Sequence, residues 1–406
     1  MYWMMMVNVV EKIKDMKKLL FVILILFANL ANAQNADLQW TATWSTAPEQ
    51  IGQKDMPKES LSDRSLREIV HVSIGGSELR LKLTNEFSKS PVEIKSVYIA
   101  DAAEGWNIDV KTAKYLTFSG KKNVTIEPGQ ALFSDALKYD LKPLQRLSIT
   151  INYGSVVPEF ATCHRGSRTT SYILTGTSKP KSDFSEAENI DKWYNISSID
   201  VMAAGDTPVI VALGNSITDG NGTTTNMQNR WTDFMAEAYG GRASVLNLGI
   251  GASSMVRSNA PACGALRFDR DVLGQSAVKS VIVFYGVNDI GESRGRYEEV
   301  ANDLIKGYQE FIRKAHNAGI KIYLATITPI GDSFYYSHFH EATRKTVNDW
   351  IRNCKDADGV IDFDAAVRDS SRPEVTRQEL TTDHLHLNPK GYELLGNYAH
   401  DCLTGN

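Results

Sequence analysis

The sequence lacks the features that mark several broad classes of protein. It has no long basic run, and 44 Lys and Arg residues face 48 Asp and Glu residues, for a net charge of −4. Phosphate binding needs clustered Lys and Arg, so nucleic acid is not expected as a partner. No spacing of Cys and His residues indicates a metal site. Beyond the first 33 residues, no apolar run is long enough to cross a membrane.

Cysteine is also scarce, with only Cys163, Cys263, Cys354 and Cys402 in the chain. Four cysteines allow three complete disulfide pairings, and the sequence does not choose among them. Cys354 and Cys402 both end predicted helices of the same domain, so this pair ranks first if disulfides form. Four buried free thiols are an equal alternative.

The longest apolar run lies near the N-terminus. Residues 19–30 (LLFVILILFANL) follow Met16-Lys17-Lys18 and precede Ala31-Asn32-Ala33. A basic start, an apolar centre and a small-x-small end are typical of a secretory signal peptide. We therefore expect a signal peptide over 1–33, cleaved after Ala33, with Met16 as the true start and 1–15 as an upstream extension. The expected location is secreted, periplasmic or on the cell surface.

A length of 406 residues suits two domains. Short alternating strands over 64–153, separated by turns such as Gly75-Gly76, predict a β-sandwich or jelly-roll-like domain over 34–175. Its first strand, Trp40–Trp44, could instead join the sheet of the second domain. Residues 176–206 are polar and rich in turn signals, and are interpreted as a connection.

From Pro208 on, strands alternate with helices, which predicts an α/β domain over 207–406 with a parallel sheet. The clearest helix is 297–315, whose apolar residues keep helical spacing. The expected strands are 208–213, 243–248, 280–285, 320–326 and 359–363.

The stretch Val209–Gly222 (VIVALGNSITDGNG) is the centre of this second domain. An apolar strand ends in Gly214-Asn215-Ser216, and a helical pattern follows. Active sites of open α/β sheets lie at the carboxyl ends of the strands, so Ser216 falls where chemistry is expected. On this segment alone, a helix N-cap is an equally good interpretation of the serine.

Two later segments favour a nucleophile. Residues 280–289 (SVIVFYGVND) form another apolar strand that ends in Asn288 and Asp289, and residues 382–389 (TDHLHLNP) place Asp383 three residues before His386. A serine nucleophile needs a base, and the base needs an orienting carboxylate. His386 and Asp383 supply both, and Asn288 supplies an N–H donor for an oxyanion.

With these segments the chain resembles the SGNH hydrolases, also called GDSL-like esterases. The matching blocks, in order, are GNSITDG (214–220), NLGIGASS (247–254), GVND (286–289) and DHLH (383–386). The resemblance covers Pro208 to the C-terminus. It implies a three-layer α/β/α, flavodoxin-like domain, with Ser216, His386 and Asp383 as the catalytic triad. No cofactor is needed.

The blocks depart from the family pattern in two places. Asn215 stands where the family usually has Asp, a position whose role is mainly structural. Ala252 stands where the oxyanion glycine is usual, next to Gly251. The resemblance implies an oxyanion hole of the Ser216 N–H, the Gly251 or Ala252 N–H and the Asn288 side chain.

The N-terminal half resembles a branch of SGNH proteins linked to plant cell-wall polysaccharides. The matching pieces are Trp40–Trp44, LREIVHVSIGGSELRLKLTNEF (66–87) and Arg168–Tyr172. This implies a secreted serine esterase that removes short acyl groups, chiefly acetyl, from an acylated carbohydrate. A broad-range lipase or arylesterase and a non-catalytic carbohydrate-binding protein are the alternatives. The β domain either binds carbohydrate or walls the catalytic cleft, and the second is slightly favoured.

Two loops remain to be assigned. Residues 267–271 (RFDRD) carry four charges and are interpreted as a local salt-bridge network near the site. Residues 331–340 (GDSFYYSHFH) follow the fourth strand and are expected to contact substrate. His338 or His340 is the rival catalytic base, but neither has a carboxylate at a fixed short spacing, as His386 does.

Overall fold

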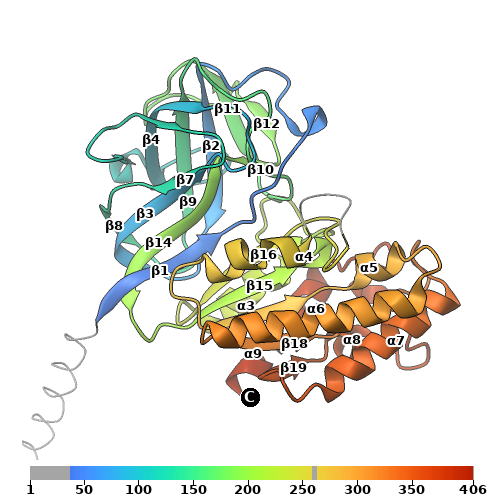
Figure 1. The fold of residues 1–406 in the computed structure, drawn as a ribbon. Coiled ribbons are helices and arrows are strands. Elements are labelled where there is room, and N and C mark those ends of the chain that lie inside the picture. The colour runs from blue at the N-terminus through green and yellow to red at the C-terminus, as the bar shows by residue number, and fades with distance from the viewer. Residues whose placement is uncertain (1–36, 258–262, 406) are drawn as a thin grey trace, which may run out of the picture. The chain divides into compact units, whose positions relative to one another are not determined.

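The computed structural model describes residues 37–257 and 263–405 (Figure 1). The predicted signal peptide and its upstream extension lie outside the described residues. A small unit contains Asp37–Gln39 and Ala204–Asp206, held by hydrogen bonds from Gln39 to Gly205 and from Gly205 to Asp37. Residues 40–203 and 207–405 belong to the main unit, which contains the two domains described next.

The N-terminal domain is a β-sandwich of two antiparallel sheets, as the sequence predicts. One sheet has the order β1 (Leu38–Ser45), β14 (Ile196–Ala204), β3 (Gly76–Thr84) and β7 (Ala131–Phe133), with β8 (Leu137–Leu141) also paired to β3. The other has the order β12 (Glu188–Ile190), β11 (Ser171–Thr175), β2 (Arg64–His71), β9 (Arg146–Tyr153), β4 (Val92–Asp101) and β5 (Lys114–Tyr115), with β6 (Val124–Ile126) paired to β4. A short ladder joins β10 (Cys163–His164) to β13 (Trp193–Tyr194).

The expectations for two segments of this domain can be compared with the structure. Of the two alternatives left open for Trp40–Trp44, the structure has the strand in the N-terminal domain, where β1 pairs with β14. Residues 176–206 are not a plain connection, because they contain β12, β13 and β14. Polar residues and a register shift between Ile196 and Ser198 mask the alternation of β14.

The C-terminal domain is built on a five-stranded parallel sheet. Its order is β16 (Ser244–Gly249), β15 (Val209–Gly214), β17 (Ser280–Phe284), β18 (Lys321–Ala325) and β19 (Gly359–Ile361). Numbered along the domain, this is the order 2-1-3-4-5 of flavodoxin-like folds, in which ligands bind beside the first strand at its carboxyl end. β15 and β17 are buried at every residue, which explains their continuous apolar runs, whereas β18 and β19 each have residues that are partly exposed.

Helices cover both faces of this sheet, which gives the predicted three layers. One layer contains α3 (Trp231–Tyr239), α8 (Phe363–Val367) and α9 (Pro389–Thr404), and the other contains α4 (Gly264–Phe268), α6 (Tyr297–Asn317) and α7 (His338–Asn353) (Figure 1). The short helices α2 (Ser216–Asp219) and α5 (Val287–Gly291) follow β15 and β17 directly. Each therefore begins at the carboxyl edge of the sheet.

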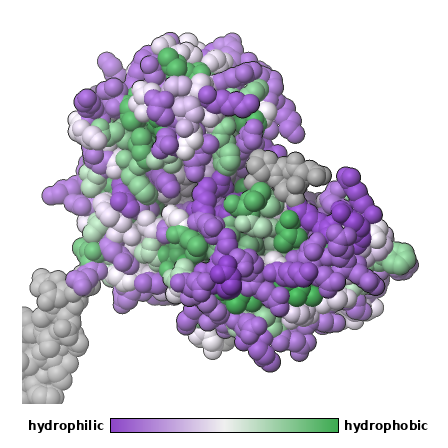
Figure 2. Space-filling view, in the orientation of Figure 1, coloured by the Kyte–Doolittle hydropathy of each residue, from purple (hydrophilic) through white to green (hydrophobic). Residues whose placement is uncertain are grey.

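Each domain has a hydrophobic core of its own. Hydrophilic residues dominate the face seen in Figure 2, where apolar residues form small separate patches. No two of the four cysteines, all of which lie in the described chain, are joined by a disulfide. Among the described residues, no helix is both long and apolar enough to cross a membrane.

Candidate active site

The turn after β15 presents Ser216 at the carboxyl edge of the sheet. Asn215 is the N-cap of α2, because its side-chain oxygen accepts the Ile217 N–H at 3.0 Å. Asn therefore caps the helix at the position where the family usually has Asp. Gly214 is required here, because a Cβ would overlap the Thr218 side chain. The serine is thus the first residue of a one-turn helix, where backbone N–H groups lack helical partners.

The structure joins Ser216, His386 and Asp383 in one chain of hydrogen bonds. His386 Nε2 lies 2.9 Å from Ser216 Oγ, and His386 Nδ1 lies 2.6 Å from Asp383 Oδ2. The second oxygen of Asp383 accepts the backbone N–H groups of His386 and Leu385 at 2.7 and 3.0 Å. These contacts fix the imidazole so that Nδ1 faces the carboxylate and Nε2 faces the serine.

The same contacts keep Asp383 ionised. Partial burial alone would raise the pKa of this carboxyl, but the hydrogen bonds from the His386 ring and from two backbone N–H groups lower it below its usual value. The loop that carries both residues is closed by a bridge between Thr381 and Leu387, and Thr381 Oγ1 donates to the His386 carbonyl at 2.7 Å. A closed loop explains why Asp and His three residues apart can meet.

Asn288 lies in α5, directly after β17. Its side chain is 6% exposed, and its Nδ2 donates to the Ser253 carbonyl at 2.9 Å. Tyr335 donates from its hydroxyl to Asn288 Oδ1 at 3.2 Å. Because Oδ1 is occupied by a donor, the amide group is held in one orientation, with its N–H groups directed away from Tyr335. Sequence reasoning missed Tyr335, although the loop that carries it was singled out.

The second block follows β16, next to the serine turn. Ala252 has φ = 62°, the left-handed conformation that glycine adopts most readily, which explains why a glycine is usual at this position. Asp289 holds the same loop by accepting the N–H groups of Met255 and Val256 at 2.8 and 3.1 Å. Burial raises the pKa of Asp289 to about 6, with these N–H groups opposing the shift.

The charged segment 267–271 is helical, in α4 and the π-helical turn Asp269–Leu273, and not a loop. Arg267 is 2% exposed and pairs with Asp271, as the predicted local network requires. It also donates to the carbonyls of Leu248 and Gly214 at 2.7 and 2.8 Å, at the ends of β16 and β15. Charge spacing alone did not reveal this second role, which ties together the ends of β15 and β16 beside Ser216.

The rival histidines are engaged elsewhere. His340 contacts Ser293 Oγ at 3.0 Å and the Tyr335 carbonyl at 2.6 Å, and His338 contacts the Tyr336 hydroxyl at 3.3 Å. Of the three candidate bases, His386 is the one that contacts Ser216 Oγ. Within residues 37–257 and 263–405, no group of three or more His, Cys, Asp or Glu side chains is arranged to hold a metal ion.

Comparison with known proteins agrees with these motifs. The model of the GDSL-like lipase/acylhydrolase family matches residues 212–394. No curated protein sequence matches the chain. Similar solved structures include the carbohydrate acetylesterase Est24 of Sinorhizobium meliloti, at 16% identity over 49% of this chain and 99% of that one, with a TM-score of 0.39. The chain is also similar to a lipase/acylhydrolase of Enterococcus faecalis (21% identity, 49% and 96% covered, TM-score 0.37).

A third similar structure is an acetyl xylan esterase, at 22% identity over 47% of this chain and 97% of that one, with a TM-score of 0.36. The family match covers the four blocks that the sequence presents, from the serine turn to the Asp-x-x-His loop. Residues 212–394, which make up most of the α/β domain, are therefore identified as a GDSL-like lipase/acylhydrolase domain.

Proposed function

We propose that this protein is a secreted serine esterase that hydrolyses short-chain acyl esters, chiefly acetyl, on plant polysaccharides or their oligosaccharides. One observation carries the proposal: an unbroken chain of hydrogen bonds runs from Ser216 through His386 to Asp383. A serine bonded to an oriented imidazole is the arrangement that nucleophilic acyl transfer needs.

In the proposed reaction, Ser216 Oγ forms a bond to the ester carbonyl carbon while its proton passes to His386 Nε2. The tetrahedral intermediate then loses the sugar alcohol, which takes that proton from His386. Water attacks the acyl-enzyme with His386 again as base, and the carboxylic acid and free Ser216 are released. Asp383 stabilises the imidazolium without taking its proton, in agreement with its lowered pKa.

The negative oxygen of each intermediate needs donors that are already in place. The proposed donors are the backbone N–H of Ser216, the N–H of Gly251 or Ala252, and the side chain of Asn288. The bonds of Asn288 to Ser253 and Tyr335 support this role, because they fix the amide before substrate arrives. A donor that does not need to reorganise stabilises the transition state most.

The loop after β18 supports a carbohydrate substrate. Tyr335 contacts Asn288, so this loop borders the proposed oxyanion position, and the neighbouring Phe334 ring is 74% exposed. An exposed aromatic ring beside a reactive group marks a ligand-binding surface, and the flat face of a sugar can stack on such a ring. The same ring could instead contact an acyl chain, which is the lipase or arylesterase alternative.

The test is a series of kcat/KM values for 4-nitrophenyl acetate, butyrate and octanoate, with acetate release from acetylated xylan and pectin measured in parallel. We expect acetate to be the best acyl group and acetylated polysaccharide to be a substrate. If an acyl tunnel existed, each buried CH₂ would add about 0.8 kcal/mol, so a rise from acetyl to octanoyl would favour the lipase. Failure to hydrolyse any ester would contradict the esterase proposal and favour the alternative of a non-catalytic carbohydrate-binding protein.

A pair of variants separates the aromatic loop from the chemistry. Phe334→Ala should raise KM for acetylated polysaccharide while leaving hydrolysis of 4-nitrophenyl acetate unchanged. Phe339→Ala is the matched control, because Phe339 is 64% exposed but stacks on Tyr297. Equal effects of the two variants on polysaccharide would remove the support that this loop gives to the substrate assignment.

A further inference from the structure

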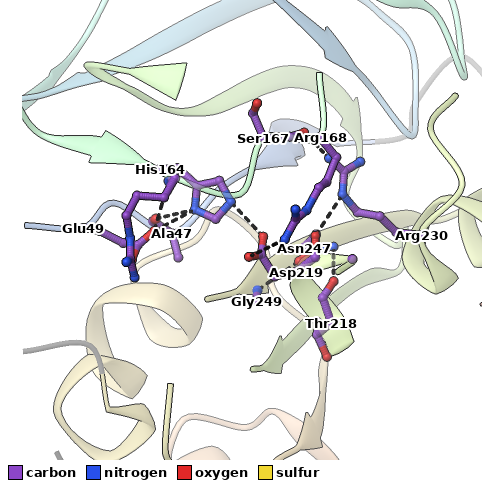
Figure 3. A network of polar contacts seen from close by, with 12 residues as sticks. Ala47, Glu49, His164, Ser167, Arg168, Thr218, Asp219, Arg230, Asn247 and Gly249 are labelled. Carbon is purple, nitrogen blue, oxygen red and sulfur yellow. Dashed lines mark hydrogen bonds and ion pairs between the residues drawn. The ribbon is translucent and has the colours of Figure 1, made fainter. Parts of the chain in front are cut away.

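A cluster of charged residues surrounds the end of the nucleophile turn (Figure 3). Asp219 is the last residue of α2, three residues after Ser216, and its side chain is 4% exposed. A buried carboxylate is stable only when charged or polar partners replace its lost hydration. The partners of Asp219 therefore decide how firmly this turn is held.

The nearest partner of the Asp219 side chain comes from the β-sandwich. His164, in β10, lies with Nε2 at 3.1 Å from Asp219 Oδ1 and with Nδ1 at 3.0 Å from the Ala47 carbonyl. Both ring nitrogens face an oxygen acceptor, and the imidazolium is the form of the ring that carries a proton on each nitrogen for both acceptors. Trp193 stacks on the ring at a centroid distance of 5.8 Å and so fixes its plane.

Two arginines complete the contacts to Asp219. Arg168, also from the sandwich, lies 3.7 Å from Asp219 Oδ2. Arg230 donates from Nε to the Asp219 backbone carbonyl at 3.3 Å, and its guanidinium also donates to the Ser167 carbonyl. The segment 164–168 of the sandwich thus holds both the side chain and, through Arg230, the backbone of Asp219.

The approach of the two domains is close at this point. A Cβ on Gly166 would overlap the Asp219 carboxylate, and a Cβ on Gly249 would overlap the backbone nitrogen of Asp219. The turn therefore lies between the end of β16 and the 164–168 segment with no room for another side chain. A shift of Asp219 would be transmitted to Ser216, because the Asp219 N–H bonds to the Asn215 carbonyl within the same turn.

Further charged groups set the protonation of this cluster. Glu49, after β1, lies 3.6 Å from His164 Nδ1 and is itself paired with Arg165. Burial disfavours the charged ring, but the Asp219 and Glu49 carboxylates and the Ala47 carbonyl raise the pKa of His164. Burial likewise opposes ionisation of Asp219, yet His164, Arg168 and Arg230 lower its pKa. Both directions favour the ion pair.

We propose that His164 is a positioning residue for Ser216, through Asp219, so that the β-sandwich takes part in ester hydrolysis and does not merely wall the cleft. The inference rests on the proposed esterase function. His164 is buried and bonds to Asp219 and Ala47, so it would act on Ser216 indirectly. Its effect is to keep the one-turn helix, and with it the serine oxygen, at the distance from His386 that proton transfer needs.

The fold offers a matched control in a second histidine of the sandwich. His71, in β2, has Nδ1 at 4.0 Å from Asp233 Oδ1 and Nε2 at 2.8 Å from the Leu144 carbonyl. Asp233 lies in the first turn of α3, which carries no residue of the proposed triad. The two pairs share residue types and both link the sandwich to the α/β domain. His164 contacts Asp219 directly, whereas Asp233 is linked to Asp219 only indirectly, through Arg230.

The experiment compares His164→Gln with His71→Gln in the full chain. We measure kcat and KM for 4-nitrophenyl acetate, the rate at which a fluorophosphonate probe labels Ser216, and Tm, with kinetics taken well below the Tm of each variant. His164→Gln should lower kcat and the labelling rate by about 10- to 100-fold with KM within about twofold. His71→Gln should lower Tm but leave kcat and labelling within about twofold.

Further variants keep the test decisive if His164→Gln does not fold. Arg168→Gln, at a partly exposed and longer contact, should lower labelling in the same direction by a few-fold, on the order of 3-fold. Unchanged labelling in every folded variant, or an equal loss in His71→Gln, would overturn the positioning role. If wild type hydrolyses no ester yet is labelled at Ser216, the proposed function fails while labelling still tests the positioning. A wild type that does neither overturns both.

Discussion

Two histidine–aspartate pairs lie beside the turn that carries Ser216. They differ in the distance between the two side chains, in their exposure and in the partner of the second ring nitrogen. His386 and Asp383 are 2.6 Å apart with the Asp383 side chain 45% exposed, whereas His164 and Asp219 are 3.1 Å apart with both side chains at most 5% exposed. The second nitrogen of His386 faces a serine hydroxyl, and that of His164 faces a backbone carbonyl.

The difference shows that the partner of the second nitrogen decides what such a pair can do. A hydroxyl both gives and accepts a proton, so the ring of His386 can exchange one with Ser216. A carbonyl only accepts, so the ring of His164 satisfies both neighbours only while both of its nitrogens carry a proton. The first pair is therefore suited to acid–base chemistry, and the second to holding a charge in place.

Removing the exchanging ring should have the largest effect. His386→Ala is expected to lower kcat by about 10⁴- to 10⁶-fold, because no other group can take the serine proton. Circular dichroism should show that the variant keeps its fold. His338→Ala, which alters a rival base bonded to Tyr336, should leave kcat unchanged. Substantial activity in His386→Ala would move the base elsewhere.

Weakening the same pair at its carboxylate should have a smaller effect. Asp383→Asn is expected to lower kcat by roughly 10²- to 10⁴-fold, because the carboxylate orients the ring and stabilises its charge but does not take the proton. Steady-state kinetics for 4-nitrophenyl acetate measure this directly. A nearly silent substitution would make Asp383 a structural residue of the loop.

The same substitution in the buried pair should act on stability. Asp219→Asn removes the nearest counter-ion of the buried His164 charge and leaves the more distant Glu49, which should lower the free energy of unfolding by about 3 kcal/mol. Asp383→Asn, on an exposed loop, should cost less than about 1 kcal/mol. Urea unfolding of both variants gives the comparison. Equal losses of stability would contradict the assignment of a buried ion pair to Asp219.

The smallest expected effect is a change in how stability depends on pH. The pKa of His164 is raised by folding, so its contribution is full below the unfolded value of about 6.5 and is lost as pH rises through the folded value. Tm of the wild type should fall between pH 7 and 9 by more than Tm of His164→Gln. All other titrating groups, including Asp289, are shared by the two proteins, so parallel curves would rule out a charged His164.

Much of the catalytic domain could be predicted from the sequence. The strands β15 and β17 are buried at every residue and are therefore almost continuously apolar, and the proposed triad residues lie in compact sequence blocks. The strand β14 was not predicted, because Ser197 and Ser198 interrupt its apolar pattern. The sequence left the placement of β1 open, because a strand near a domain boundary can pair with either sheet.

The buried pair could not be predicted for a different reason. His164 and Asp219 are separated by 55 positions and lie in different domains, so no periodicity or local motif links them. Asp219 lies inside the recognised GNSITDG block and Arg168 inside the matching piece Arg168–Tyr172, but nothing in either segment indicates that the two residues meet. Arg267 was seen as a local ion-pair partner, whereas its bonds to Gly214 and Leu248 depend on how the strands are arranged in three dimensions.

The position of β14 has a consequence for the order of synthesis. This strand lies between β1 and β3, yet it is the last strand of the sandwich to be made, ending at Ala204, and β15 begins at Val209. Until the ribosome has passed this point, β1 has no neighbour in its sheet and the sandwich cannot close. Since domains tend to fold as they emerge, the sandwich is completed just before the nucleophile strand appears. Asp219 thus leaves the ribosome when the surface that receives it has only just formed.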